Sequence, residues 1–269
     1  MSTEYLITVE NQSPNPQEFY FFQEPAHYAG GSTVYTNTIS HGKLPAYNSG
    51  VTSQLQFSLI SQYYAGVQKQ LSPPIIGNAQ LGIISQAAID VTHSGKEKNK
   101  TDVVIDEDGG IYLNTPEHED AVQQGSFRIA TPTFNPNQTK INIGLSGRNE
   151  KGAIIMSNFI IGEPTKNIDV QPIVKFYVKT GSYKQGTVVN FTESSKDSAM
   201  CDATNGTEYF TVIYKQDGSW EVHPSCKSDI INSDDICGLK CPTCGADPGC
   251  IQNKRHPGKH RCADCGTEF

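Results

Sequence analysis

Apolar and polar residues alternate along several short stretches of the chain. The apolar residues recur at every second position in residues 5–9, 55–59, 141–145 and 174–178. A period of two places the two kinds of residue on opposite faces of a strand, as in an antiparallel sheet with one face in water. Further strands are predicted over residues 18–23, 33–38, 82–91, 126–130, 153–161 and 187–192. No segment has a sustained helical period with caps, so the pattern predicts an all-β chain.

Tight turns are predicted between several of these strands. Asp-Gly pairs occupy residues 108–109 and 217–218, each between two apolar segments. Asp-Gly tolerates the positive φ of a tight hairpin turn, so both pairs predict hairpins. A third hairpin is predicted to join residues 140–145 to residues 153–161.

Short strands with turn chemistry between them predict an antiparallel β-sandwich. The polar segment 114–125 either separates two small sandwiches or forms a long loop of one large sandwich. The prediction for the whole chain is a β-sandwich body over residues 1–226, a polar linker over 227–237 and a small module over 238–269.

Composition fits a β-protein that is rich in turns. Charged residues make up 18% of the 269 residues, and there are 24 Gly and 15 Pro. The net charge of −7 resides entirely in the body, because residues 231–269 contain five basic and five acidic side chains. An acidic body is a poor partner for a phosphate backbone or an anionic membrane. With no secretory leader and no membrane span predicted, the expected location is the cytoplasm.

The final module contains two pairs of cysteines with the spacing of a metal site. Cys241, Cys244, Cys262 and Cys265 give the pattern C-x2-C-x17-C-x2-C, and a glycine follows each pair. Two cysteines separated by two residues turn both thiolates toward one ion, and two such pairs complete a tetrahedral shell for zinc. Four thiolates leave no open position, so the zinc is expected to be structural.

These residues resemble the zinc-ribbon family over about residues 238–269. The resemblance implies that Cys241, Cys244, Cys262 and Cys265 are the zinc ligands. Iron is the alternative metal, because rubredoxin-type sites share the CPxCG motif. The alternative to a metal is two disulfide or redox pairs, which reduced cytosolic thiols disfavour.

A cluster of basic residues lies between the two cysteine pairs and includes Lys254, Arg255, Lys259 and Arg261. It is interpreted either as a solvated hairpin tip or as a tip that binds a protein or nucleic acid. Binding to nucleic acid would depend steeply on salt and would be lost on charge reversal of the tip.

Support for catalysis is weak in the sequence, so whether the chain is an enzyme stays open, with a non-enzyme favoured. The sequence gives no support for Cys201 as a nucleophile with His223 as its base. Cys201 and Cys226 are interpreted as two separate reduced thiols and not as a disulfide bridge. The aromatic run 19–22 either stacks on sugars or fills the core. Residues 62–66 and 175–181 are similar to β-rich proteins of unassigned function in fungi and bacteria.

The expected function is therefore a non-catalytic interaction or assembly protein that binds a protein partner or itself. The zinc ribbon would serve as its docking module. A nucleic-acid-associated protein and a sugar-binding β-sandwich are the alternatives.

Overall fold

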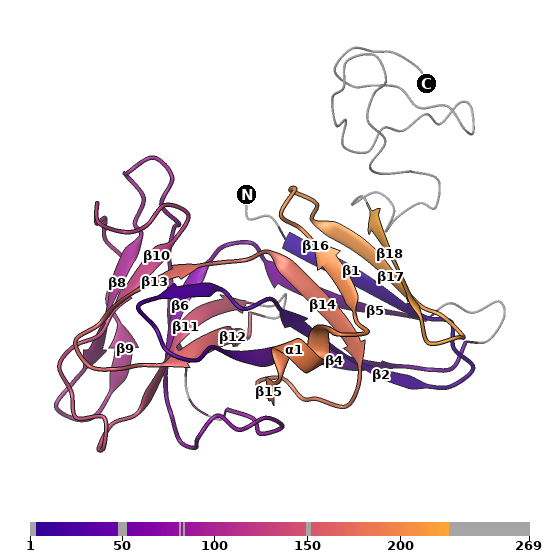
Figure 1. Ribbon diagram of the computed structural model, residues 1–269, viewed down its shortest axis with the longest axis horizontal. Coiled ribbons are helices and arrows are strands. Elements are labelled where there is room, and N and C mark those ends of the chain that lie inside the picture. Colours follow the sequence, from indigo (N-terminus) through magenta and orange to yellow (C-terminus); the bar gives the residue numbers. More distant parts are fainter. Residues whose placement is uncertain (1–3, 48–52, 81, 83, 149–151, 226–269) are drawn as a thin grey trace, which may run out of the picture.

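The computed structural model describes residues 4–47, 53–80, 82, 84–148 and 152–225 (Figure 1). These residues form eighteen strands and one short helix, so the predicted all-β class is confirmed. No helix in this described part of the chain is long and apolar enough to cross a membrane. The predicted linker and zinc ribbon lie outside the described residues.

The strands form three sheets. The four-stranded sheet has the order β18 (Trp220–Ser225), β17 (Tyr209–Tyr214), β1 (Glu4–Asn11) and β5 (Gln54–Ile60). The five-stranded sheet has the order β3 (His27–Ala29), β13 (Asn167–Gln171), β10 (Phe127–Ala130), β8 (Lys100–Ile105) and β9 (Ile111–Leu113).

The third and largest sheet has nine strands. Its order is β16 (Ala199–Asp202), β14 (Lys175–Thr180), β2 (Gln17–Gln23), β4 (Tyr35–Leu44), β12 (Ile154–Ile161), β11 (Ile141–Arg148), β6 (Tyr64–Lys69) and β7 (Ile84–Ala88), and β15 (Val188–Val189) pairs with β4. We call it the long sheet.

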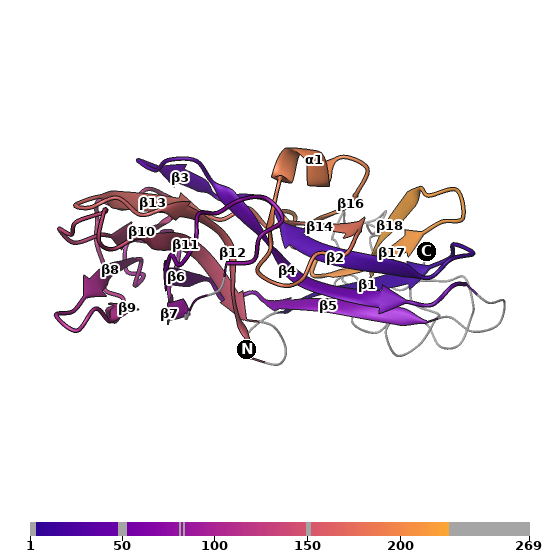
Figure 2. The ribbon, with the colours of Figure 1, turned by 90° about the horizontal axis from the view of Figure 1, so that it is seen from below.

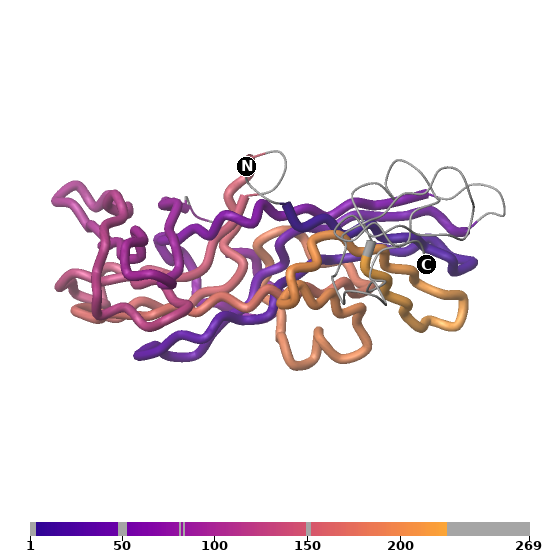
Figure 3. The backbone as a smooth tube through the Cα atoms, turned by 90° about the horizontal axis from the view of Figure 1, so that it is seen from above, coloured from indigo at the N-terminus to yellow at the C-terminus, as the bar shows by residue number. Residues whose placement is uncertain are grey.

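The long sheet is shared by two hydrophobic cores. One core lies between the four-stranded sheet and β16, β14, β2 and β4, with Phe21, Phe57 and Phe176 at its centre. The other lies between the five-stranded sheet and β12, β11 and β6, and it contains Phe127 and Ile143. The two halves lie end to end along the long axis (Figure 2, Figure 3).

The chain changes sheet at several points where the two halves meet. β2 belongs to the long sheet but leads into β3 of the five-stranded sheet, and β13 of the five-stranded sheet leads into β14 of the long sheet. β5 of the four-stranded sheet likewise leads into β6 of the long sheet. These crossings join the two halves covalently at several points, in addition to the hydrogen bonds of the long sheet.

A buried tyrosine hydroxyl ties two layers together near this junction. Tyr28 of β3 donates to the carbonyl oxygen of Asn158 at 2.8 Å and accepts from the backbone N–H of Leu145 at 3.1 Å. Burial raises the pKa of Tyr28, so its hydroxyl stays protonated. Gly144 makes room for this contact, since a Cβ there would lie 2.5 Å from the Tyr28 hydroxyl oxygen.

The predicted hairpins are all present. The pairs β8–β9, β17–β18 and β11–β12 are antiparallel, and Gly109 and Gly218 have φ of +80° and +82° at their turns. Antiparallel pairing predominates, but β1 pairs parallel with β17 and β8 pairs parallel with β10. Parallel pairs join strands that are distant in sequence, so the local turn pattern gave no sign of them.

The strand predicted over residues 187–192 is wrong in its second half. β15 ends at Val189, and the chain then forms helix α1 (Phe191–Ser195). Asn190 caps this helix, because its side-chain oxygen accepts a hydrogen bond from the N–H of Glu193 at 3.3 Å. Asn at an N-cap explains why the apolar alternation stops there.

The aromatic run in β2 is buried on both faces, as the core-filling interpretation predicted. Phe19 and Phe21 lie in the first core, while Tyr20 and Phe22 face the other way and are covered by Tyr177, Tyr183, Val189 and Phe191. α1 thus covers the part of the outer face of the long sheet that β2 and β14 form (Figure 1). The run offers no exposed ring on which a sugar would stack.

Candidate functional site

The candidate site is the apolar loop, defined as residues 71–77 between β6 and β7. Leu71, Ile75 and Ile76 have 67%, 57% and 58% of their surface exposed. They are three of the six large hydrophobic residues exposed in the described part of the chain; the others, Tyr47, Tyr112 and Met200, are far from them in sequence. Exposed apolar side chains gathered in one segment indicate a contact surface more than scattered ones do.

Backbone hydrogen bonds hold both ends of the apolar loop. The N–H of Gln70 donates to Lys140 at 2.8 Å, and the N–H of Gly77 donates to Val188 in β15 at 2.8 Å. Within the loop, Ile75 donates to Pro73 at 2.9 Å. Proline fixes φ and reduces the freedom of the chain, so Pro73 and Pro74 stiffen the segment.

Buried amide side chains connect the residues that flank the apolar loop to the long sheet. Gln68 donates to the carbonyl of Gly82 at 2.9 Å, and Gln70 donates to the side chain of Asn142 at 3.3 Å. Asn142 in turn donates to Gln80 at 3.4 Å. The flanks of the loop are therefore fixed while its apolar side chains stay in water, which is the arrangement of a preformed docking element.

The apolar loop itself carries no formal charge. Residues 70–80 contain neither a basic nor an acidic side chain, although the exposed Lys69 precedes them and the exposed Lys140 accepts the backbone hydrogen bond of Gln70. Phosphate groups are bound by Lys, Arg and N–H donors, so the loop itself lacks the charged side chains that attract a nucleic acid.

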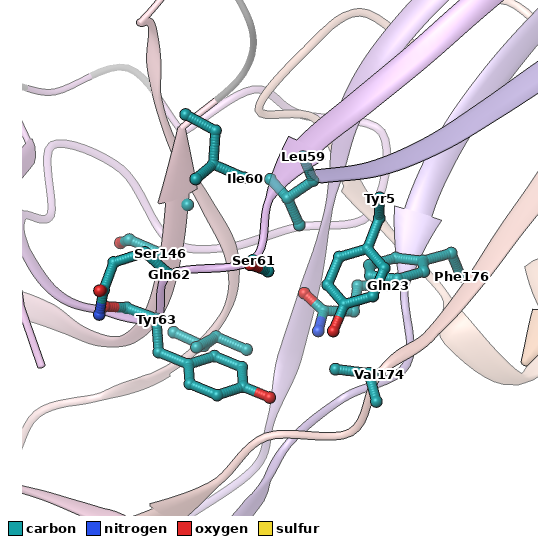
Figure 4. Close-up of a pocket in the computed structure, with 12 residues that line it drawn as sticks. Tyr5, Gln23, Leu59, Ile60, Ser61, Gln62, Tyr63, Ser146, Val174 and Phe176 are labelled. Carbon is teal, nitrogen blue, oxygen red and sulfur yellow. The ribbon is translucent and has the colours of Figure 1, made fainter. Parts of the chain in front are cut away.

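A narrow crevice lies where the two halves meet, and the segments that change sheet line it (Figure 4). Tyr5 and Tyr63 direct their hydroxyls toward the same space, beside Gln23 and Val174. The pKa of Tyr5 is raised to about 12, mainly by burial and to a smaller extent by the nearby Tyr63. The hydroxyl of Tyr5 is therefore neutral at physiological pH. The space is about 10 Å³, enough for about one water molecule.

The polar segment 114–125 is a loop of one half, so it does not separate two sandwiches. Arg128 of β10 pairs with Asp169 of β13 at 2.6 Å and reaches Glu119 in the loop at 2.5 Å. The hydrogen bonds and charge of Asp169, with a smaller contribution from Glu119, raise the pKa of Arg128. Asn99 adds a bond, since its side-chain oxygen accepts from the N–H of Glu119 at 2.9 Å.

Cys201 lies in the first core and is a free thiol. Burial raises the pKa of this thiol, which is the opposite of what an activated nucleophile needs. His223, which was considered above as a base for Cys201, is exposed. Its Nε2 atom lies 3.2 Å from the Oε1 atom of Glu221. Cys226 lies outside the described residues.

The residues predicted to hold zinc and to form the basic tip all lie outside the described residues: Cys241, Cys244, Cys262, Cys265, Lys254, Arg255, Lys259 and Arg261. Within the described ranges, no group of three or more His, Cys, Asp or Glu side chains is placed to hold a metal ion.

Comparisons with protein-family models, with curated proteins and with solved structures gave no match to this chain.

Sequence reasoning missed the apolar loop. A signal was present: Leu71, Ile75 and Ile76 flank Pro73-Pro74 in a segment with no strand period. Prolines exclude a regular strand, and apolar residues placed beside them have no sheet face on which to be buried.

The ion pair that anchors the loop 114–125 yields a stability prediction. Arg128 and Asp169 have side chains only 12% and 6% exposed, and Asp169→Ala leaves a nearly buried guanidinium that still pairs with Glu119. We expect a loss of about 1.5–3 kcal/mol in the free energy of unfolding, measured by denaturant titration.

The matched control is Glu163→Ala, which removes a surface ion pair to Lys166 whose side chains are 57% and 48% exposed. This change should cost about 0–1 kcal/mol. Equal losses for the two variants would contradict the structural role assigned to Asp169.

Proposed function

We propose that this protein is a non-catalytic interaction or assembly protein that works in the cytoplasm. The β body presents the apolar loop to a protein partner, and the C-terminal module, a zinc ribbon, provides a second docking element. The single observation that supports this best is the exposure of Leu71, Ile75 and Ile76 on a segment fixed at both ends.

The energy available from this loop is sufficient for specific binding. Full burial of a Leu or Ile side chain contributes about 1.5–3 kcal/mol, so three such side chains supply several kcal/mol toward association. The loop is already ordered by its bonds to Lys140 and Val188, so binding costs little conformational entropy. An apolar groove on the partner protein would bury the three side chains together.

The zinc ribbon is supported by the spacing of its cysteines. Cys241, Cys244, Cys262 and Cys265 match the paired pattern of four-thiolate zinc sites, and Pro242 and the glycines after each pair complete the two knuckles. A segment of this size has too little apolar surface to fold on burial alone, so metal binding would supply its folding free energy. Reduced cytoplasmic thiols keep the four ligands available.

The role of the apolar loop predicts the loss of partners in a triple variant. Leu71→Ser, Ile75→Ser and Ile76→Ser together should abolish capture of partner proteins from extracts of the host cells, measured by quantitative mass spectrometry. The free energy of unfolding should change little, because exposed side chains contribute about 0.5 kcal/mol or less each.

The control for the triple variant carries Tyr112→Ser and Met200→Ser, which replace exposed hydrophobic residues in β9 and β16. It should capture the same proteins as the natural chain. If the triple variant still captures all of these proteins, the apolar loop is not the surface that binds them.

The zinc ribbon predicts one zinc ion for each chain of purified, reduced protein, measured by elemental analysis. Cys244→Ser should strongly weaken zinc binding, since it removes one of the four thiolates of the tetrahedral shell. Cys250→Ser, which changes a cysteine between the two pairs, should leave one zinc per chain. Iron in place of zinc would indicate a rubredoxin-type site, and the absence of stoichiometric metal would contradict the ribbon.

A further inference from the structure

Strand β5 forms one end of the four-stranded sheet. It pairs with β1 in a regular antiparallel register along its whole length, from Glu4 opposite Ile60 to Glu10 opposite Gln54. Among the described residues, no strand and no backbone hydrogen bond meets its other side. On that side β5 therefore has no partner strand in the described part of the chain, and its residues Gln54 and Gln56 are exposed.

The other sheet ends carry features that discourage pairing, and β5 does not. β3 and β9 have only three residues each, and β18 contains Pro224. In β16, Asp202 is paired with Lys175 at 3.5 Å, and in β7 the hydroxyl of Ser85 accepts from the N–H of Leu113 in β9. The seven residues of β5, QLQFSLI, include no charge, proline, glycine or bulge. Natural edge strands normally carry at least one of these.

We propose that β5 pairs antiparallel with β5 of a second copy of this chain. The two four-stranded sheets then become one continuous sheet across a two-fold axis, as in an isologous dimer. This inference rests on the proposed function and narrows it, because it names the chain itself as one partner. The apolar loop remains free for a different protein.

The central five residues of β5 match themselves about such an axis. With Phe57 on the axis, Leu55 lies opposite Leu59 of the second copy and Gln56 lies opposite Ser58 of the second copy. Residues opposite each other share a face, so these apolar residues meet on one face and these uncharged polar residues meet on the other, while Gln54 at the end of the strand lies opposite Ile60. The carboxylate of Glu10 in the neighbouring strand is already bound by Gln54 at 2.8 Å. The strand itself therefore brings no like charges together.

The test is sedimentation of the full chain over a range of concentrations, with charge variants at Gln56. This side chain is exposed on β5, so the substitutions should leave the monomer folded, as thermal unfolding will verify. Gln56→Lys places two lysines diagonally across the axis, about 7–8 Å apart, and Gln56→Glu does the same with two carboxylates. Each variant should raise the dissociation constant of the dimer at least about tenfold.

A mixture of the two variants should restore dimers, because the diagonal neighbours then carry opposite charges. The control pair, Gln171→Lys and Gln171→Glu, changes an exposed glutamine in β13 and should dimerise like the natural chain. A natural chain that stays monomeric at every concentration would overturn the proposal. So would a dimer that is indifferent to charge at Gln56, or homodimers of both variants as stable as their mixture.

These results are separable from those on the proposed function. The triple variant of the apolar loop keeps β5 intact and should still dimerise, while the Gln56 variants should still capture the loop's partners. Loss of dimerisation with retained capture would reject only the pairing of β5. Dimerisation with no captured partner would reject only the role of the loop.

Discussion

The hydrogen-bonded continuity of the long sheet is the constraint on which the rest of the structure depends. β4 pairs with β2 along one part of its length and with β12 and β15 along another, so it belongs to both halves. The cores on either side of this junction are separate clusters, but neither can move without breaking backbone pairs of the shared sheet. Strands that change sheet at the same place strengthen this link.

This constraint leaves the ends of sheets and the loops as the surfaces that other molecules can reach. The crevice at the junction is filled by side chains down to about the size of one water molecule. The apolar loop, by contrast, lies outside both cores and is fixed to β15 and to the residue before β11. A rigid sheet framework that carries exposed contact segments is the usual architecture of binding proteins, in which the framework positions the loop and the loop makes the contact. β5 extends the same argument to a strand that pairs on one side only in the described part of the chain.

Local patterns in the sequence predicted much of the fold. Alternating apolar residues located the strands around Val9, Phe57 and Ile143, and the Asp-Gly pairs located two hairpins, because these features depend on neighbours in the chain. The parallel pairing of β1 with β17 was not predictable, since the two strands are about 200 residues apart in the chain and no turn links them. The same limitation applies to Arg128 and Asp169, which are neighbours only because β10 pairs with β13. The cysteine spacing was readable from the sequence alone, whereas the exposure of Ile75 and Ile76 at the candidate site depends on how the chain packs.

Native-state hydrogen exchange, measured amide by amide, tests most directly whether the shared sheet makes the body one cooperative unit. The amides of β2 in the first core and of β11 in the second should exchange only through global unfolding. They should therefore show the same free energy of opening and the same dependence on denaturant. Opening of one core at a lower free energy, while the other stays protected, would contradict the account.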